Sequence, residues 1–191
     1  GMSELAEGKF HINDILEINL NDLLGREEIK IDIDLLKFNI FDKVVLVTGA
    51  GGSIGSEICR QIIKIKPKTI ILFEISESSL YTIERELINI SASDVEIFPV
   101  LGSVVDKKRI ESIYKQYGVN TVYHAAAYKH VPLVEFNKSQ GIMNNTIGTL
   151  VAAEAAIAAK VDTFILISSD KAVRPSNIMG VSKRLAELIL Q

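Results

Sequence analysis

The 191-residue sequence has no tryptophan, one cysteine, four prolines and a formal net charge of only -3. A lone cysteine, Cys59, cannot form an internal disulfide, which is typical of a reducing compartment. The 21 basic and 24 acidic residues are spread along the chain, so they create no field for nucleic acid or an anionic membrane. There is no signal peptide and no uninterrupted apolar run of the ~18 residues that suggest a membrane span. These absences favour a globular, cytoplasmic chain.

Metal binding is also not expected. His124 and His130 lack a metal-ligand spacing with any nearby cysteine or carboxylate, and His11 is distant in sequence.

The most informative stretch is KVVLVTGAGGSIGSEICRQI, residues 43–62, in which an apolar run leads into three spaced glycines and a helix-period pattern. It predicts a buried strand, a tight phosphate-binding turn and a helix. The first glycine permits the turn, the second lets the backbone approach a pyrophosphate, and the third lets helix and strand pack closely. The helix start directs N–H groups at the anion. The residues predicted to contact the cofactor here are Gly49, Gly52, Ser53, Ile54 and Gly55.

From Lys43 onward, short apolar runs alternate with helix-period segments, which indicates βαβ units. We predict a Rossmann-like α/β fold: a three-layer, doubly wound parallel sheet with strand order 3-2-1-4-5. Runs such as TIILFE and TFILIS are apolar throughout, as expected of strands covered on both faces. The expected strands are residues 43–48, 69–74, 95–101, 121–125 and 163–168, and the expected helices are residues 53–65, 78–90, 106–117 and 138–160.

The sequence divides into two regions. Residues 1–42 are predicted to be a preamble that packs on the edge of the main domain, with a short helix after IKIDIDLL, and residues 43–191 form the NAD-binding domain. Gly1 before Met2 looks like the remnant of an expression tag. The sequence stops within a helical pattern, RLAELILQ, so we expect a fragment that is truncated after the fifth strand and its following helix.

Glu74 is the residue that selects the cofactor. It ends the second predicted strand about 20 residues after the glycine motif, where a carboxylate accepts hydrogen bonds from both ribose hydroxyls of an adenosine. A carboxylate there also repels a 2′-phosphate, so NAD is favoured over NADP. The alternative is that the side chain of Lys66 or Arg85 folds back toward Glu74, which would change the preference for NAD over NADP.

Small residues follow the next two strands. Ser103 and Val104, in LGSVVD, could border an adenine ring. Ala125, Ala126 and Ala127 have almost no side chain, which allows a ribose or pyrophosphate to lie against the backbone. Lys129 follows and would serve either the substrate or the cofactor.

A last group of polar residues comes after the fifth predicted strand, in ISSDKAVRPSNIMGVSKR. Ser169, Asp170 and Lys171 fall just past the strand. Met179 and Lys183 are four residues apart and therefore share one helix face.

The motifs VTGAGGSIGSE, AAAYKHVPLVE, NNTIGT and SSDKAVRPSNIMGVSKR resemble, in order and spacing, the extended short-chain dehydrogenase/reductase superfamily over about residues 16–191. Within it they look like bacterial nucleotide-sugar 4,6-dehydratases of polysaccharide synthesis, of the type that converts UDP-N-acetylglucosamine to a 4-keto-6-deoxy sugar. The usual Tyr-x-x-x-Lys appears as Met179 to Lys183, a departure shared with the membrane-associated branch. Ser103 departs from the aspartate that relatives often carry beside adenine.

The resemblance implies an internal redox cycle: a hydride passes from sugar C4 to NAD, water leaves across C5 and C6, and the hydride returns to C6. It makes Lys171 the C5 base, Asp170 the acid at the C6 hydroxyl and Ser169 a group that holds the sugar or its C4 oxygen. Lys183 would hold the nicotinamide ribose, and Asn145 resembles the active-site asparagine, or is an ordinary helix residue. These roles require a partly neutral, buried Lys171 and an Asp170 that keeps its proton longer than a free carboxylic acid.

The same resemblance implies that a C-terminal substrate domain lies outside this sequence. The fragment would then bind NAD but turn over little UDP-sugar, while a parent protein, with upstream spans, would be anchored to the inner membrane. A nucleotide-sugar 4-epimerase and a non-catalytic NAD-binding module remain the alternatives, and a homo-oligomer is left open.

Overall fold

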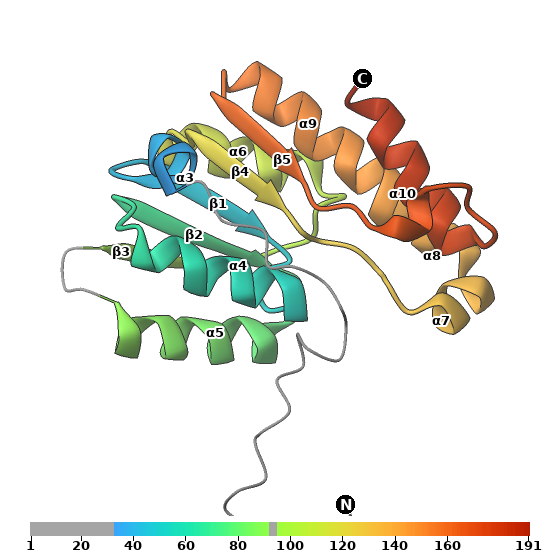
Figure 1. Ribbon diagram of the computed structural model, residues 1–191, viewed down its shortest axis with the longest axis horizontal. Helices are drawn as coiled ribbons and strands as arrows, with labels where there is room; N and C mark the ends of the chain where they lie inside the picture. Colours follow the sequence, from blue (N-terminus) through green and yellow to red (C-terminus); the bar gives the residue numbers. More distant parts are fainter. Residues whose placement is uncertain (1–32, 92–94) are drawn as a thin grey trace, which may run out of the picture. The chain divides into compact units, whose positions relative to one another are not determined.

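The computed structural model describes residues 33–91 and 95–191. Five parallel strands form one sheet in the order β3-β2-β1-β4-β5 (Figure 1), which confirms the predicted fold and strand order. The strands are β1 (Val44–Thr48), β2 (Thr69–Glu74), β3 (Glu96–Leu101), β4 (Thr121–His124) and β5 (Thr163–Leu166). The helices are α3 (Ile33–Ile40), α4 (Ser53–Lys64), α5 (Glu77–Ile90), α6 (Lys107–Tyr117), α7 (Val131–Phe136), α8 (Lys138–Ile142), α9 (Gly148–Ala158) and α10 (Ile178–Ile189).

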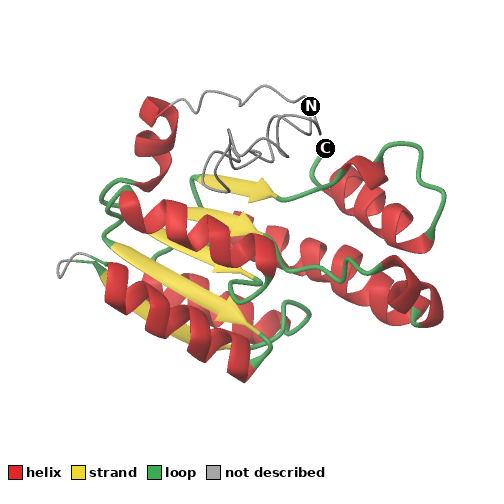
Figure 2. Cartoon of the chain, turned by 60° about the horizontal axis from the view of Figure 1, so that its bottom comes forward, coloured by secondary structure: helices red, strands yellow, loops and turns green. Residues whose placement is uncertain are grey.

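Helices lie on both faces of the sheet (Figure 2). Side chains of a strand alternate between faces, so Val45 and Val47 pack with α4 and α5, whereas Leu46 packs with α6 and α9. Every residue of β2 is buried, as its unbroken apolar pattern predicts. The chain runs from β1 outward to β3 and then crosses to β4. The strand order therefore reverses between β1 and β4, and a ligand crevice is expected at their carboxyl ends.

Three features differ from the sequence prediction. The expected helix over residues 138–160 is divided into α8, a π-helical segment at Met143–Ile147 and α9. The short α7 was not predicted, because six residues show too little periodicity to stand out. All four residues of β5 are only half-buried, since β5 is an edge strand that is paired on one side only, with β4.

The described part of the preamble packs at the amino edge of the sheet. The Thr121 hydroxyl donates to the Asn39 carbonyl oxygen at 2.7 Å, and the Thr163 hydroxyl donates to the Asn39 side chain at 2.9 Å. Ile40 is buried in the core cluster beside β1. Residues 1–32, which make up the rest of the preamble, lie outside the described residues. Within residues 33–91 and 95–191, no helix is both long and apolar enough to cross a bilayer.

Candidate cofactor and active site

The glycine turn connects β1 to α4 through backbone that side chains would disrupt. Gly49 has a φ of 66°, and a Cβ added to it would lie 2.7 Å from the Ala126 Cα. A Cβ on Gly55 would lie 2.0 Å from the Gly49 oxygen, so only glycine lets α4 pack this closely on the turn. Gly52 is the N-cap of α4 and has no side chain to cap the first N–H groups of the helix. The turn therefore leaves a helix N-terminus open toward the crevice.

Glu74 is built into this turn. One oxygen of its carboxylate accepts the Gly51 N–H at 3.0 Å, and the other accepts the N–H groups of Ile75 and Ser76 at 2.9 and 3.0 Å. The residue is only 7% exposed, so it is not a solvated strand end. A carboxylate has about four lone-pair sites, and three backbone donors leave room for a further donor from a ligand.

Gly51 was not singled out from the sequence. A Cβ added to it would lie 2.5 Å from the Ser79 Cβ of α5, so this glycine is required for the turn to sit against that helix. The signal was available as the second glycine of the pair at 51–52, but the glycine fingerprint does not include it.

Two hollows lie at the carboxyl edge of the sheet, and they meet at Gly52, Ala125 and Ala127. The first hollow lies over β2 and β3 and is lined by Gly49, Gly51, Gly52, Phe73, Glu74, Ile75, Ser79, Gly102, Ser103, Val104, Ala125, Ala126, Ala127, Tyr128 and Asn144. The second lies over β5 and is lined by Gly52, Ser53, Ile54, Gly55, Ala125, Ala127, Lys129, Ile167, Ser168, Ser169, Asp170, Lys171, Met179 and Lys183. With the exception of Asn145, every site residue predicted from the sequence lines one of these two hollows.

In the first hollow, sequence reasoning missed Asn144, which comes from a segment far from the glycine motif. The sequence also predicted that Val104 could border an adenine ring, but its side chain is buried and packs into the core beside α6 and α9. A Cβ added to Gly148 would lie 2.6 Å from Cγ2 of Val104. The part of Val104 that faces the hollow is therefore mainly its backbone.

Lys129 spans the second hollow. Its ammonium group donates a hydrogen bond to the hydroxyl of Ser53, the first residue of α4. A cation is thus held at the helix N-terminus, where the helix dipole already favours an anion.

Met179 and Lys183 project from α10 into the second hollow, as their spacing predicts, and both are buried. The Lys183 ammonium group donates to the Ile167 carbonyl oxygen at 2.7 Å. Burial lowers the pKa of Lys183 to about 8, while the charge of Glu187 opposes that shift. A buried lysine of lowered pKa in a cleft is typical of a functional position.

We expect Lys183→Met to be more stable than the wild-type chain by about 1–2 kcal/mol at pH 7, because methionine removes the cost of burying a charge. The wild-type pKa is depressed in the folded state, so the unfolded chain binds more protons between about pH 8 and 10. Wild-type stability therefore rises relative to the variant over that range, and the difference should shrink.

Urea unfolding of both proteins at pH 7 and pH 9.5 measures this, with the exposed Lys108→Met as the control. A stability difference that does not change with pH would contradict the expectation.

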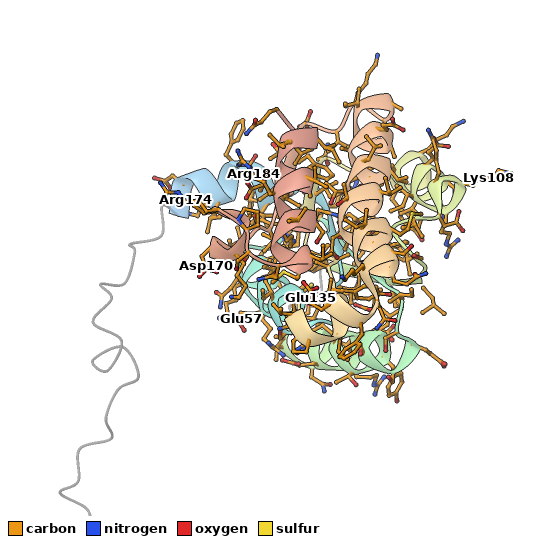
Figure 3. The ribbon with its side chains drawn as sticks, turned by 90° about the vertical axis from the view of Figure 1, so that its right-hand side faces the viewer. Glu57, Lys108, Glu135, Asp170, Arg174 and Arg184 are labelled. Atoms are coloured by element: carbon orange, nitrogen blue, oxygen red, sulfur yellow. The ribbon has the colours of Figure 1, made fainter. Side chains whose placement is uncertain are left out.

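Asp170 and Lys171 begin a short 3₁₀ turn, Asp170–Ala172, which follows β5 after the irregular residues 167–169. The Lys171 ammonium group lies 3.5 Å from the Asp170 carboxylate, and their side chains are 52% and 89% exposed. Figure 3 shows Asp170 at the outer margin of the molecule. The adjacent Lys171 charge and a hydrogen bond from the Ser169 hydroxyl lower the pKa of Asp170.

The environment of this pair differs from the sequence expectation in two respects. Lys171 is half-exposed rather than buried, and the pKa of Asp170 is shifted downward rather than upward. Lys171 is half-exposed because the described residues leave the turn open to solvent, whereas the pKa of Asp170 is lowered by the adjacent Lys171 charge and the Ser169 hydrogen bond. Proton retention by Asp170 would require a partner or ligand that covers the carboxylate.

Asn145 does not line either hollow. Its side-chain oxygen accepts the Tyr128 N–H at 2.7 Å, and its amide group donates to the Tyr128 carbonyl at 3.0 Å and to the Ser182 hydroxyl at 2.9 Å. It lies in the π-helical segment, where the Gly148 N–H reaches back five residues to the Met143 carbonyl. Asn145 therefore fixes the backbone of a lining residue rather than contacting the cleft itself.

The start of α10 depends on residues that the sequence analysis did not identify. The Ile178 N–H donates to the Glu135 carboxylate of α7 at 2.6 Å, and Glu135 lies beneath this helix in Figure 3. A Cβ on Gly180 would lie 2.3 Å from the Lys171 oxygen, so this glycine lets the 3₁₀ turn rest on α10. A glycine within a helical pattern was the available signal for Gly180.

In the part of the chain that the structure describes, no three histidine, cysteine, aspartate or glutamate side chains are grouped as a metal site would require.

A sequence model of the family described as "Polysaccharide biosynthesis protein" matches residues 45–191. The chain belongs to this family. Among similar proteins, it is 44% identical over 190 residues to the capsular polysaccharide biosynthesis protein CapD of Staphylococcus aureus, covering all of this chain and 32% of CapD. It is also 36% identical over 149 residues to a UDP-glucose 4-epimerase of Rickettsia rickettsii, covering 76% of the chain and 42% of that enzyme.

Solved structures share the fold of this family member. One is DesIV, a dTDP-glucose 4,6-dehydratase from Streptomyces venezuelae with NAD and TYD bound, which superposes with a TM-score of 0.65 at 20% identity. The match covers 76% of this chain and 50% of DesIV. The described chain thus has the same Rossmann-like fold as DesIV. It spans about a third of the length of CapD.

Proposed function

We propose that a longer protein carrying this sequence is an NAD-dependent nucleotide-sugar 4,6-dehydratase that acts on UDP-N-acetylglucosamine, and that these 191 residues form its cofactor-binding part. The observation that carries the proposal is the pair of hollows that meet at the glycine turn. One has the buried Glu74 carboxylate, and the other has Asp170 and Lys171 beside Met179 and Lys183.

The residues of the cleft fit a dinucleotide. Gly52 leaves bare backbone where the two hollows meet, and the start of α4 supplies N–H groups for a diphosphate. Glu74 would accept the adenosine ribose hydroxyls, and Lys183 would hold the nicotinamide ribose. Lys129, already bonded to Ser53, would add a positive charge beside the diphosphate.

Glu74 also supports a preference for NAD over NADP, because a buried carboxylate disfavours a 2′-phosphate. Lys66 precedes β2 and therefore lies at the opposite edge of the sheet from Glu74, about 20 Å away along a six-residue strand. Arg85 lies in the second half of α5, about two turns beyond the N-cap Ser76. Neither position favours binding of a 2′-phosphate at Glu74.

NAD, when bound, supplies a hydride acceptor and returns the hydride later in the cycle. In the proposed reaction Lys171 removes the C5 proton, Asp170 protonates the departing C6 hydroxyl, and Ser169 holds the sugar or its C4 oxygen. Met179 cannot exchange a proton, so the usual tyrosine base is absent from the described cleft. The exposed Asp170 and Lys171 would become desolvated when substrate and the remaining part of the longer protein cover them.

A nucleotide-sugar 4-epimerase is the second candidate, and the 36% identity to the Rickettsia epimerase favours it. The same C4 oxidation would serve that reaction. The Asp170–Lys171 pair instead supports elimination, because it places an acid and a base side by side at the hollow.

Mass spectrometry of the product separates the two candidates. The longer protein, incubated with UDP-N-acetylglucosamine, should give a 4-keto product that has lost one water. A product of unchanged mass whose C4 is inverted, as shown by proton NMR, would support the epimerase, and unchanged substrate despite bound NAD would support a non-catalytic module.

A further inference from the structure

His124 is a buried titratable residue that the proposed reaction does not use. It ends β4, is completely buried, and stacks on the Phe164 ring with 5.8 Å between ring centroids. Its two ring nitrogens lie within hydrogen-bond distance of two hydroxyls: Thr48 at the end of β1 and Thr149 in α9. The imidazole therefore joins the end of β1, next to the glycine turn, to α9 on the same face of the sheet.

The direction of these hydrogen bonds follows from the number of available protons. The Thr149 hydroxyl donates its single hydrogen to the Asn145 carbonyl at 2.7 Å, so at 3.1 Å it accepts from His124 Nε2. Burial, together with the nearby charge of Lys183, lowers the pKa of His124 to about 3, which keeps the ring neutral. Nδ1 then carries no proton and accepts from the Thr48 hydroxyl at 2.8 Å.

Both ends of this hydrogen-bond chain reach the wall of the first hollow. At one end the Thr48 hydroxyl oxygen accepts the Ala126 N–H at 3.3 Å. At the other end Asn145 bonds the N–H and the carbonyl of Tyr128. The bonds run in one direction from Ala126 through the imidazole to Asn145, an arrangement in which each bond polarises the next.

We propose that His124 is a positioning residue that fixes the backbone of residues 125–128 at the geometry the dinucleotide requires. Packing alone does not explain a histidine here, because a phenylalanine could fill a similar volume beside Phe164. The imidazole is distinctive in presenting a donor and an acceptor on opposite sides of a flat ring. The effect on the cofactor rests on the proposed function of the cleft, whereas the effect on the backbone does not.

The test compares His124→Phe, which removes both bonds, with His124→Asn, whose side-chain oxygen takes the place of Nδ1 and can accept from Thr48. Thr48→Val removes the hydroxyl that accepts the Ala126 N–H, with little change in side-chain volume. This variant tests the proposal if His124→Phe does not fold. Ile113→Val, a core change on α6 outside the network, is the control for lost stability alone.

Amide hydrogen exchange of the 191-residue chain without ligand is the first measurement. In His124→Phe, exchange of the Ala126 and Tyr128 amides should accelerate about tenfold relative to core amides such as that of Leu46. In Thr48→Val, the same acceleration is expected at Ala126. Ile113→Val should not single out these two amides. Unchanged relative exchange at Ala126 and Tyr128 in His124→Phe would overturn the proposal. If His124→Phe does not fold, unchanged relative exchange at Ala126 in Thr48→Val would overturn it.

Calorimetric titration with NAD is the second measurement. Affinity should fall about tenfold in His124→Phe and Thr48→Val, recover largely in His124→Asn, and stay unchanged in Ile113→Val. Wild-type affinity in both folded variants would overturn the link to the cofactor. If the wild-type chain does not bind NAD, the proposed cofactor site fails, and the exchange data still decide whether His124 fixes this backbone.

Discussion

A Gly55→Ala variant is expected to lose about 3 kcal/mol of stability, with a correspondingly lower urea midpoint. The added Cβ would lie 2.0 Å from the Gly49 oxygen and 2.8 Å from its carbonyl carbon. Both atoms belong to the backbone of the turn, so no flexible side chain can move aside. The overlap is relieved only by separating α4 from β1, which weakens the packing of α4 on β1 and β2.

Gly52→Ala is the matched control, because it adds the same methyl group three residues earlier. Its Cβ would lie 3.2 Å from the Gly49 oxygen, and the Gly52 backbone (φ -71°, ψ 163°) suits any residue. We expect a stability loss below about 1 kcal/mol and an affinity for NAD at least about tenfold lower, since the methyl group occupies the approach of the diphosphate. Equal stability of Gly55→Ala and wild type would contradict the predicted helix–turn contact.

Lys171→Ala in the longer protein is expected to slow the loss of water about 10³-fold, the usual contribution of a positioned general base. Oxidation at C4 does not depend on removal of the C5 proton, so bound NAD should still be reduced in the variant. Asp170→Asn should likewise spare C4 oxidation but slow departure of the C6 hydroxyl. The expected pattern is a reduced cofactor with little dehydrated product.

Stopped-flow absorbance of the nicotinamide, together with product mass, separates the two steps. Exchange of the C5 proton in deuterated water gives an independent readout of the base. Lys108→Ala, on the exposed face of α6, is the control for loss of a lysine charge. Near-normal dehydration by Lys171→Ala would remove the base assignment and leave Asp170 or another group as the base.

Most of the fold could be predicted because it follows from local patterns. The apolar runs at residues 43–48 and 69–74 are strands that packing buries on both faces, and right-handed crossovers then set their order. The π-helical segment could not be predicted, because one extra residue in a turn leaves the helical period of the surrounding sequence nearly unchanged. The position of Asn145 depends on that extra residue.

The candidate site was predictable where one short segment contains the signal, as for Gly49, Gly55 and the Met179–Lys183 spacing. It was not predictable where the property depends on surroundings. Lys183 and Lys171 belong to the same sequence motif, yet the first is buried and bonded to a carbonyl while the second is half-exposed. Likewise, the hydrogen bonds of His124 join three segments that are far apart in sequence.

The most direct test of the account is a calorimetric titration of the folded 191-residue chain with NAD and, separately, with NADP. We expect saturable binding of NAD at one site and an affinity for NADP at least about tenfold lower, because of the Glu74 carboxylate. A chain that is folded by circular dichroism and binds neither nucleotide would contradict the claim that the two hollows form a dinucleotide site.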